Sequence, residues 1–166
     1  MMLFGGLGFG PAHPDGSCLI RYLNDLYADF VKLDIRSGAN AGFDLPGVYG
    51  TRNIFHPTNW PGSRCQASAW ADDVGNGYLY GGYGYAINNS TRGDLGDLWL
   101  YSPSLDAFAW IGGPAAPNVP ESRGAYGEVS PDYYPSCRRA AVVWRAPLSV
   151  VFWLFGKMLA GTMPRG

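Results

Sequence analysis

The residues whose types could support chemistry are few and widely spaced in this chain of 166 residues. The two histidines, His13 and His56, each stand beside a proline in a segment rich in turn-forming residues. A metal site needs several ligands that converge on one point, and the sequence has only these two histidines, so solvated loop histidines are the simpler interpretation. Asp72 and Asp73 are adjacent, and neighbouring carboxylates in a turn point apart, which favours turn formation. The pattern predicts no metal site and no catalytic pair.

A glycine-rich segment at residues 6–10 (GLGFG) could suggest a nucleotide-binding loop, but its glycines do not follow the GxGxxG spacing. Two prolines follow, where a dinucleotide site needs a helix whose N-terminus holds the pyrophosphate. The three cysteines, Cys18, Cys65 and Cys137, include no CxxC pair, and no motif places a histidine to activate one of them. We therefore expect no cofactor and no enzymatic activity.

The composition favours a folded chain built from short strands. Hydrophobic residues make up 47% of the sequence and charged residues 15%, which argues against disorder. The 24 glycines and 13 prolines, with 15% aromatic residues, are typical of strands joined by tight turns. The net charge is −1, from 12 basic and 13 acidic residues, so the chain offers no basic surface for a nucleic acid.

Neither a signal peptide nor a membrane span is predicted. The chain opens MMLFGG, without the basic and long apolar stretches of a signal peptide. The apolar stretch at residues 148–155 is about 8 residues long, against the ~20 that cross a bilayer, and is better explained as a buried strand. These features favour the cytoplasm over secretion and leave the compartment of the protein open.

An internal repeat defines the elements that position these residues, at a spacing of about 75 residues. The matched segments are 3–9 (LFGGLGF) with 79–85 (LYGGYGY), 23–27 (LNDLY) with 95–99 (LGDLW), 48–50 (VYG) with 125–127 (AYG), 61–64 (PGSR) with 135–138 (PSCR), and Trp70 with Trp144. Residues 154–156 (LFG) begin a third pass.

Each repeat unit is expected to form one small antiparallel sheet of four strands. The strands are predicted at residues 64–71, 78–82, 95–101 and 107–111. Each of these runs of aromatic and aliphatic residues ends at a segment of turn-forming residues, such as 72–77 (DDVGNG). No helical period is sustained, so the predicted fold class is all-β.

These motifs resemble the kelch repeat, of the long-period kind found in galactose-oxidase-like propellers. The resemblance rests on a hydrophobic-Gly-Gly strand, an Asp-Leu-aromatic strand, a separated tryptophan and a Pro-x-x-Arg opening. The residues that carry these features are Gly5, Gly6, Gly81, Gly82, Asp25, Asp97, Trp70, Trp99, Trp110, Trp144, Arg64 and Arg138. The resemblance implies four-stranded blades of a β-propeller.

On this template the chain holds a little over two blades, an incomplete array. Residues 1–63 would form a partial first blade with a long loop, 64–134 a complete blade with a long loop, 135–157 the start of a third blade, and 158–166 a divergent tail. The first blade departs from the pattern, because its outer-strand region lacks a match for Trp110. We expect a fragment of a longer propeller.

The expected function is binding of a protein or peptide. Because successive strands alternate in direction, the long loops should open on one face, as on a scaffold that carries a binding surface. The candidate contacts are the tyrosines of these loops and two arginines: Arg64, Arg138, Tyr83, Tyr85, Tyr133 and Tyr134. Two simpler interpretations stay open, that the arginines are buried against loop carbonyls and that the long loops only cover neighbouring blades.

Other interpretations follow from the same resemblance. The aromatic loops could bind carbohydrate, as in a galactose-oxidase-like propeller. The copper-radical site of that family needs a Tyr-His pair, which this sequence lacks, so oxidase activity is not implied. A truncated product could have no independent function, and exposed blade faces could drive self-association.

Two sets of polar residues have simpler expected roles. Asp25 and Asp97 recur at one position of the repeat, which favours a structural hydrogen bond to neighbouring backbone over catalysis. Asn88 and Asn89 begin overlapping N-x-S/T sequons, which would carry glycans only in a secreted protein.

Overall fold

The structure, a computed structural model, describes residues 3–9, 20–27, 35–36, 43–88, 90–145 and 152–156. The regular structure in these residues consists of β-strands in antiparallel sheets, so the predicted all-β class is confirmed. The described residues include no helix long and apolar enough to cross a membrane. The tail predicted at residues 158–166 lies outside the described residues.

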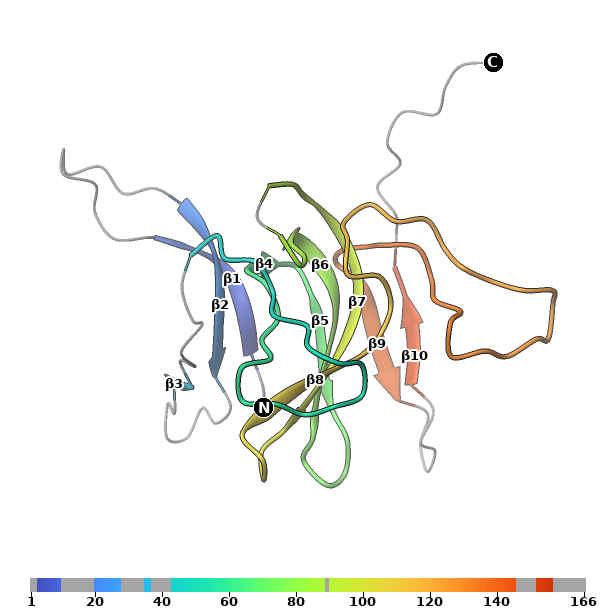
Figure 1. The fold of residues 1–166 in the computed structure, drawn as a ribbon, viewed down its shortest axis with the longest axis horizontal. Helices are drawn as coiled ribbons and strands as arrows, with labels where there is room; N and C mark the ends of the chain where they lie inside the picture. The colour runs from blue at the N-terminus through green and yellow to red at the C-terminus, as the bar shows by residue number, and fades with distance from the viewer. Residues whose placement is uncertain are drawn as a thin grey trace, which may run out of the picture.

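The described strands form three sheets. The first sheet has the order β1 (Leu3–Phe9), β2 (Ile20–Tyr27) and β3 (Ile35–Arg36). The central sheet has the order β4 (Arg64–Cys65), β6 (Gly77–Tyr85), β7 (Arg92–Ser102) and β8 (Ala107–Gly112), with β5 (Ser68–Ala71) also paired to β6. The last sheet pairs β9 (Val142–Arg145) with β10 (Phe152–Phe155). The first and last sheets flank the central sheet on opposite sides (Figure 1).

The central sheet has the strand order expected from the sequence. β4 and β5 together cover the strand predicted at residues 64–71, and β6, β7 and β8 follow in turn. Gln66, with a positive φ of 56°, separates β4 from β5. β6 and β7 are longer than expected and remain paired as far as Tyr85 and Arg92. Tyr83 and Tyr85 therefore lie within a strand, and their prediction as loop residues is wrong.

Glycine pairs interrupt the strand register at the same place in the first and central sheets. A Cβ on Gly81 would lie 2.5 Å from the carbonyl oxygen of Arg138, and a Cβ on Gly5 would lie 2.5 Å from that of Arg64. These glycines therefore let the next sheet approach closely. All four glycines have positive φ: Gly5 62°, Gly6 133°, Gly81 64° and Gly82 100°.

The backbone of residues 44–71 repeats in residues 118–145, at an offset of 74 residues. Positive φ occurs at Asp44 and Asn118, and again at Gln66 and Ala140. Strands β5 and β9 start and end at the same offset. The sequence repeat is therefore also a repeat of backbone conformation.

One of the sequence matches is displaced in the structure. Backbone bridges join Val48 to Trp60 and Ser122 to Tyr134. Val48 therefore corresponds to Ser122, and not to the residue at the start of the AYG motif.

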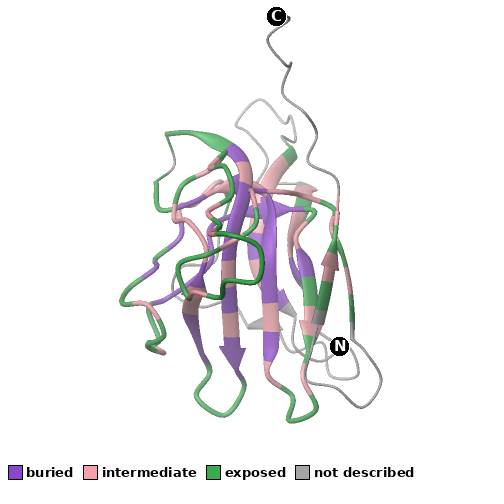
Figure 2. Ribbon diagram, turned by 90° about the vertical axis from the view of Figure 1, so that its right-hand side faces the viewer, coloured by how far each residue is buried: buried purple, intermediate pink, exposed green. Residues whose placement is uncertain are grey.

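The hydrophobic core lies between the first and central sheets. Trp60, from the loop that joins them, packs 5.1 Å from Phe108 and 6.3 Å from Phe4, measured between ring centroids. Phe4 itself lies 5.9 Å from Phe108. Figure 2 shows buried residues along the middle of the strands and exposed residues at the turns. Because aromatic side chains bury large areas, this contact holds the two sheets together.

We expect Gly81→Ala to destabilise the protein more than Gly75→Ala. Both glycines have positive φ, 64° and 90°, which costs an alanine about 1–2 kcal/mol. At Gly81 the new Cβ would also meet the Arg138 carbonyl oxygen, whereas nothing lies within 4 Å of a Cβ at Gly75. Urea unfolding should show a loss larger by at least about 1 kcal/mol for Gly81→Ala. Equal losses would contradict the close approach of the two sheets.

Candidate functional site

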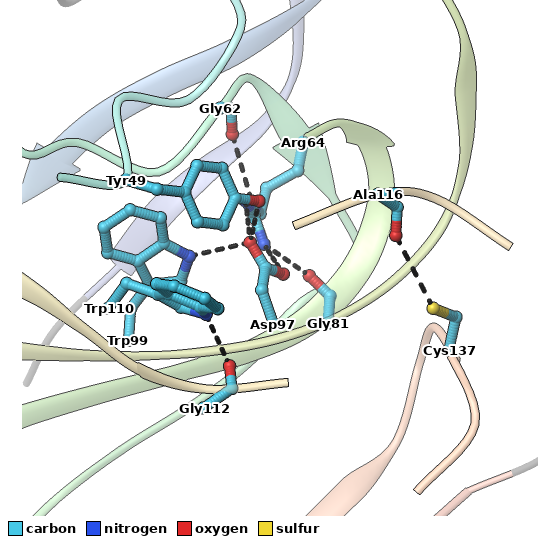
Figure 3. Close-up of polar contacts among 10 residues, drawn as sticks. All are labelled: Tyr49, Gly62, Arg64, Gly81, Asp97, Trp99, Trp110, Gly112, Ala116 and Cys137. Atoms are coloured by element: carbon cyan, nitrogen blue, oxygen red, sulfur yellow. Dashed lines mark hydrogen bonds and ion pairs between the residues drawn. The ribbon is translucent and has the colours of Figure 1, made fainter. Parts of the chain in front are cut away.

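Arg64 and Asp97 form an ion pair in which neither side chain has exposed surface (Figure 3). Nη1 of Arg64 lies 2.7 Å from Oδ1 of Asp97 and Nη2 lies 2.8 Å from Oδ2, which is a bidentate contact. Nε and Nη1 of Arg64 also donate to the carbonyl oxygens of Gly62 and Gly81, at 3.0 Å each. The guanidinium therefore joins the loop before β4 to β6 and β7.

Two aromatic side chains complete the hydrogen bonds of the Asp97 carboxylate. The Tyr49 hydroxyl donates to Oδ2 at 2.6 Å, and the Trp99 indole N–H donates to the same oxygen at 2.7 Å. Burial alone would raise the pKa of Asp97, but Arg64 and these hydrogen bonds hold it below its ordinary value. Burial and the Asp97 charge raise the pKa of Tyr49 well above its ordinary value. The cluster is a fully bonded structural charge pair.

This cluster changes two of the predictions. Arg64 is fully buried and bound to carbonyl oxygens, which agrees with the buried alternative and leaves it unavailable to a partner from solution. Asp97 accepts hydrogen bonds from side chains, and not from the neighbouring backbone as predicted. Tyr49 was missed, because no local pattern connects a loop tyrosine with an aspartate 48 residues further on.

Arg138 occupies the repeat position of Arg64, and the described residues give it no acidic partner. Its Nε donates to the carbonyl oxygen of Ser136 at 3.0 Å, the contact that Arg64 makes with Gly62. Its Nη2 donates to the Ser136 hydroxyl at 3.2 Å. The side chain is half-buried, and no carboxylate of the described residues forms an ion pair with it.

Asp25 occupies the repeat position of Asp97, and no arginine of the described residues pairs with it. Among the described residues, its buried Oδ1 has no hydrogen-bond partner, so the predicted bond to neighbouring backbone is not made by this atom. Arg21, the arginine that precedes it in the sequence, pairs with Asp44 at 2.8 Å. The described repeat thus has a complete ion pair, Arg64 with Asp97, in the central sheet. On either side it has a half pair, which is one charged residue without the other: Asp25 in the first sheet and Arg138 before the last sheet.

Tyr83 and Tyr85 gather with Tyr22 at the contact between the first and central sheets. The ring of Tyr22 lies 6.0 Å from that of Tyr83 and 6.3 Å from that of Tyr85. The Arg139 guanidinium lies 4.1 Å from the centroid of the Tyr83 ring, and its Nε lies 2.6 Å from Oδ1 of Asp94. These half-buried tyrosines connect the sheets and do not form an open surface.

The loop of residues 43–63 lies along the outer strand of the central sheet. The backbone N–H groups of Asn53 and His56 donate to the carbonyl oxygens of Trp110 and Phe108 on β8, at 2.9 Å and 3.3 Å. Nδ2 of Asn59 also donates to the Phe108 carbonyl, at 3.2 Å. This long loop covers a strand edge, in agreement with the alternative that long loops cover their neighbours.

The loop of residues 113–137 projects at the end of the molecule that carries β9 and β10 (Figure 1). It contains an open pocket of about 630 Å³, lined in part by Glu121, Arg123, Tyr126, Glu128, Tyr133 and Tyr134. Tyr126 is fully exposed, and Tyr133 is 38% exposed. Tyr133 and Tyr134 are therefore predicted contacts that lie beside an open concave surface.

The tryptophan landmarks have packing roles in the central sheet. Trp70 stacks on Tyr78 with ring centroids 5.4 Å apart. Trp99 is fully buried, and Trp110 meets Tyr49 edge-on at 5.5 Å. Trp144, at the repeat position of Trp70, is 48% exposed.

The remaining candidate residues offer no assembled site. In the part of the chain that the structure describes, no group of three or more His, Cys, Asp or Glu side chains could hold a metal ion. His56 has Nδ1 2.7 Å from the Thr58 hydroxyl, and His13 lies outside the described residues. Asn88 is exposed and accepts a hydrogen bond from Ser90, whereas Asn89 lies outside the described residues.

Comparison of the chain with protein-family models, with curated proteins and with solved structures found no match. The antiparallel all-β fold and the surfaces described above are therefore the grounds for a functional proposal.

We expect Asp97→Asn to cost about 3–5 kcal/mol of stability, because it leaves the buried Arg64 charge uncompensated. Tyr49→Phe removes a single donor from the same carboxylate and should cost about 1–3 kcal/mol. Urea unfolding at neutral pH measures both losses. A loss for Asp97→Asn no larger than that for Tyr49→Phe would contradict the central position of the ion pair.

Asp97 should also make the stability of the protein depend on pH in acid. Its pKa is lower in the folded chain than the ordinary value, which is about 3.9 in an unfolded chain. Its contribution is therefore complete above about pH 5 and is lost as the pH falls through the folded pKa. Unfolding measured from pH 6 downwards should show a flatter acid limb for Asp97→Asn than for the wild type. Identical acid limbs would count against the assignment.

Proposed function

We propose that this chain is a non-catalytic, kelch-type module that binds an extended segment of a partner protein at loop 113–137. The repeat motifs and the strand order of the central sheet support the kelch assignment. The observation that carries the function is the correspondence between this loop and loop 43–63, which binds a β-strand within the same molecule.

Loop 43–63 shows how such a loop holds a strand. Its backbone N–H groups donate hydrogen bonds to carbonyl oxygens on the edge of β8. Nε of Arg52 donates a further hydrogen bond to the Ile111 carbonyl oxygen at 3.2 Å. The bridge between Ser122 and Tyr134 closes loop 113–137 as the bridge between Val48 and Trp60 closes loop 43–63. At the offset of 74 residues, Gly127 corresponds to Asn53 and is exposed, and Ser130 corresponds to His56 and is half-buried. An added strand at this place would be a form of β-augmentation.

The pocket combines aromatic rings with charged groups, which suits a polypeptide. The Tyr133 hydroxyl donates to Oε2 of Glu128 at 3.3 Å, and Arg123 pairs with Glu121 at 3.1 Å, mainly in solvent. Gly124 leaves room for the Tyr133 hydroxyl, because a Cβ there would overlap it. Tyrosine offers a large contact area at low cost in side-chain entropy, which makes it a frequent anchor of interfaces.

Selection from a displayed library of random linear peptides tests this proposal. We expect enriched peptides whose affinity falls at least tenfold with Tyr133→Ala or Tyr134→Ala, as for interface anchors worth more than about 1.4 kcal/mol. Val74→Ala is the matched control, because Val74 is 83% exposed in the turn between β5 and β6 and should leave binding unchanged.

Two outcomes would overturn the proposal. One is the absence of any enriched peptide, and the other is binding that the two tyrosine variants leave intact. Glycan-array binding that depends on the same tyrosines would instead support the carbohydrate-binding alternative.

A further inference from the structure

We propose that Arg138 of one molecule pairs with Asp25 of a second copy, so that the chain associates head to tail. In this contact β9 of one molecule adds to β1 of the next. The new ion pair reproduces the contact of Arg64 with Asp97 in the central sheet. The inference does not depend on peptide binding by loop 113–137.

Arg138 and Asp25, near the two ends of the repeat, carry opposite charges and do not pair with each other in the structure. In the sequence no Asp or Glu follows Asp132. Among the described residues, no carboxylate forms an ion pair with Arg138. Oδ1 of Asp25 is buried without a partner among the described residues. A buried carboxylate gains most from a bidentate guanidinium, as the central sheet shows.

Strand β1 matches the strand that β9 already binds. Residues 3–5 in β1 have the sequence LFG, which recurs in the last two residues of β10 and the following Gly156. In the last sheet Val143 pairs with Leu154, just as Ala69 pairs with Leu79 at the same repeat position of the central sheet. Among the described strands β1 pairs with β2 alone, and no described strand pairs with its other edge. A second copy of β1 can therefore replace β10 in the same register.

Strand β10 pairs with β9 but leaves two aromatic side chains exposed. Its Trp153 and Phe155 are 53% and 72% exposed. Phe4, at the repeat position of Phe155 on β1, is 6% exposed, because it packs on Trp60 and Phe108 of its own molecule. The exchange thus replaces β10, whose aromatic side chains are exposed, with β1, whose Phe4 is already packed in its own molecule. It also adds the ion pair between Arg138 and Asp25. Exchange of equivalent elements is a low-cost route to association.

Reversal of the two charges tests the pair. Size-exclusion chromatography with light scattering should show a mass above that of the 18.0 kDa chain for the wild type near 100 µM, since an interface with a Kd of about 10 µM would then be mostly occupied. Arg138→Asp alone and Asp25→Arg alone should each weaken association at least tenfold. An equimolar mixture of the two variants should restore it, because each mixed contact again joins opposite charges. Val74→Arg, a charge change in the exposed turn before β6, should leave association unchanged.

Charge-neutral variants separate loss of the ion pair from unfolding that a reversed charge could cause. Arg138→Gln and Asp25→Asn should keep a cooperative melt and still lose association at least tenfold. A wild type that stays monomeric near 100 µM would overturn the proposal, as would association that both neutral variants leave intact. The peptide selection uses variants of the pocket in loop 113–137 and is performed on the monomeric fraction. Its result is therefore independent of the association measurement.

Discussion

The structure depends on the buried ion pair between Arg64 and Asp97, because both charged groups need hydrogen-bond partners from the surrounding chain. Removing two charges from water costs several kcal/mol for each ion, and this cost is offset only when every donor and acceptor finds a partner. At Arg64 and Asp97 the partners come from the Gly62 loop, the Gly81 bulge of β6 and Tyr49 of the preceding loop. One site thus connects the loop before β4, strands β6 and β7, and the part of loop 43–63 that carries Tyr49. The same requirement makes the half pairs at Arg138 and Asp25 informative.

Contacts between sheets show that a repeat unit is not self-contained. Gly82 donates its N–H to the Arg138 carbonyl at 3.0 Å, and Arg138 donates its own N–H to the Leu95 carbonyl at 2.8 Å. The backbone of Arg138 therefore bonds to the central sheet that precedes it, while the side chain of Arg64, at the same repeat position, bonds within the sheet that it begins. Stability in such an array resides in the junctions as much as in the sheets. A surface with an unfilled junction is the natural place for a further molecule.

Local chemistry in the sequence predicts the strands of the central sheet, because turn segments and glycine pairs act on their own neighbours in the chain. At Gly81 and Gly82 the sequence predicts the end of a strand, whereas the structure has a register shift within a strand that continues. Contacts between distant segments are not readable: the burial of Arg64 depends on Asp97 and Tyr49, and the path of loop 43–63 depends on an edge of β8. Tyr83 and Tyr85 extend β6 because Asp94 and Arg92 are available to pair with them. A pattern within one segment carries no information about such partners.

The separation along the chain between the members of the buried cluster also orders the assembly of the central sheet. β6 and β7 are joined by a short loop, so their hairpin closes at a small entropic cost. Arg64 must then bridge 33 residues to reach Asp97, and Tyr49 must bridge 48. The contacts of Arg64 and Tyr49 with Asp97 close longer loops, so they become favourable only after the hairpin has placed the Asp97 carboxylate. We therefore expect this sheet to fold from the hairpin towards the N-terminal side, with the loop that carries Tyr49 ordered last.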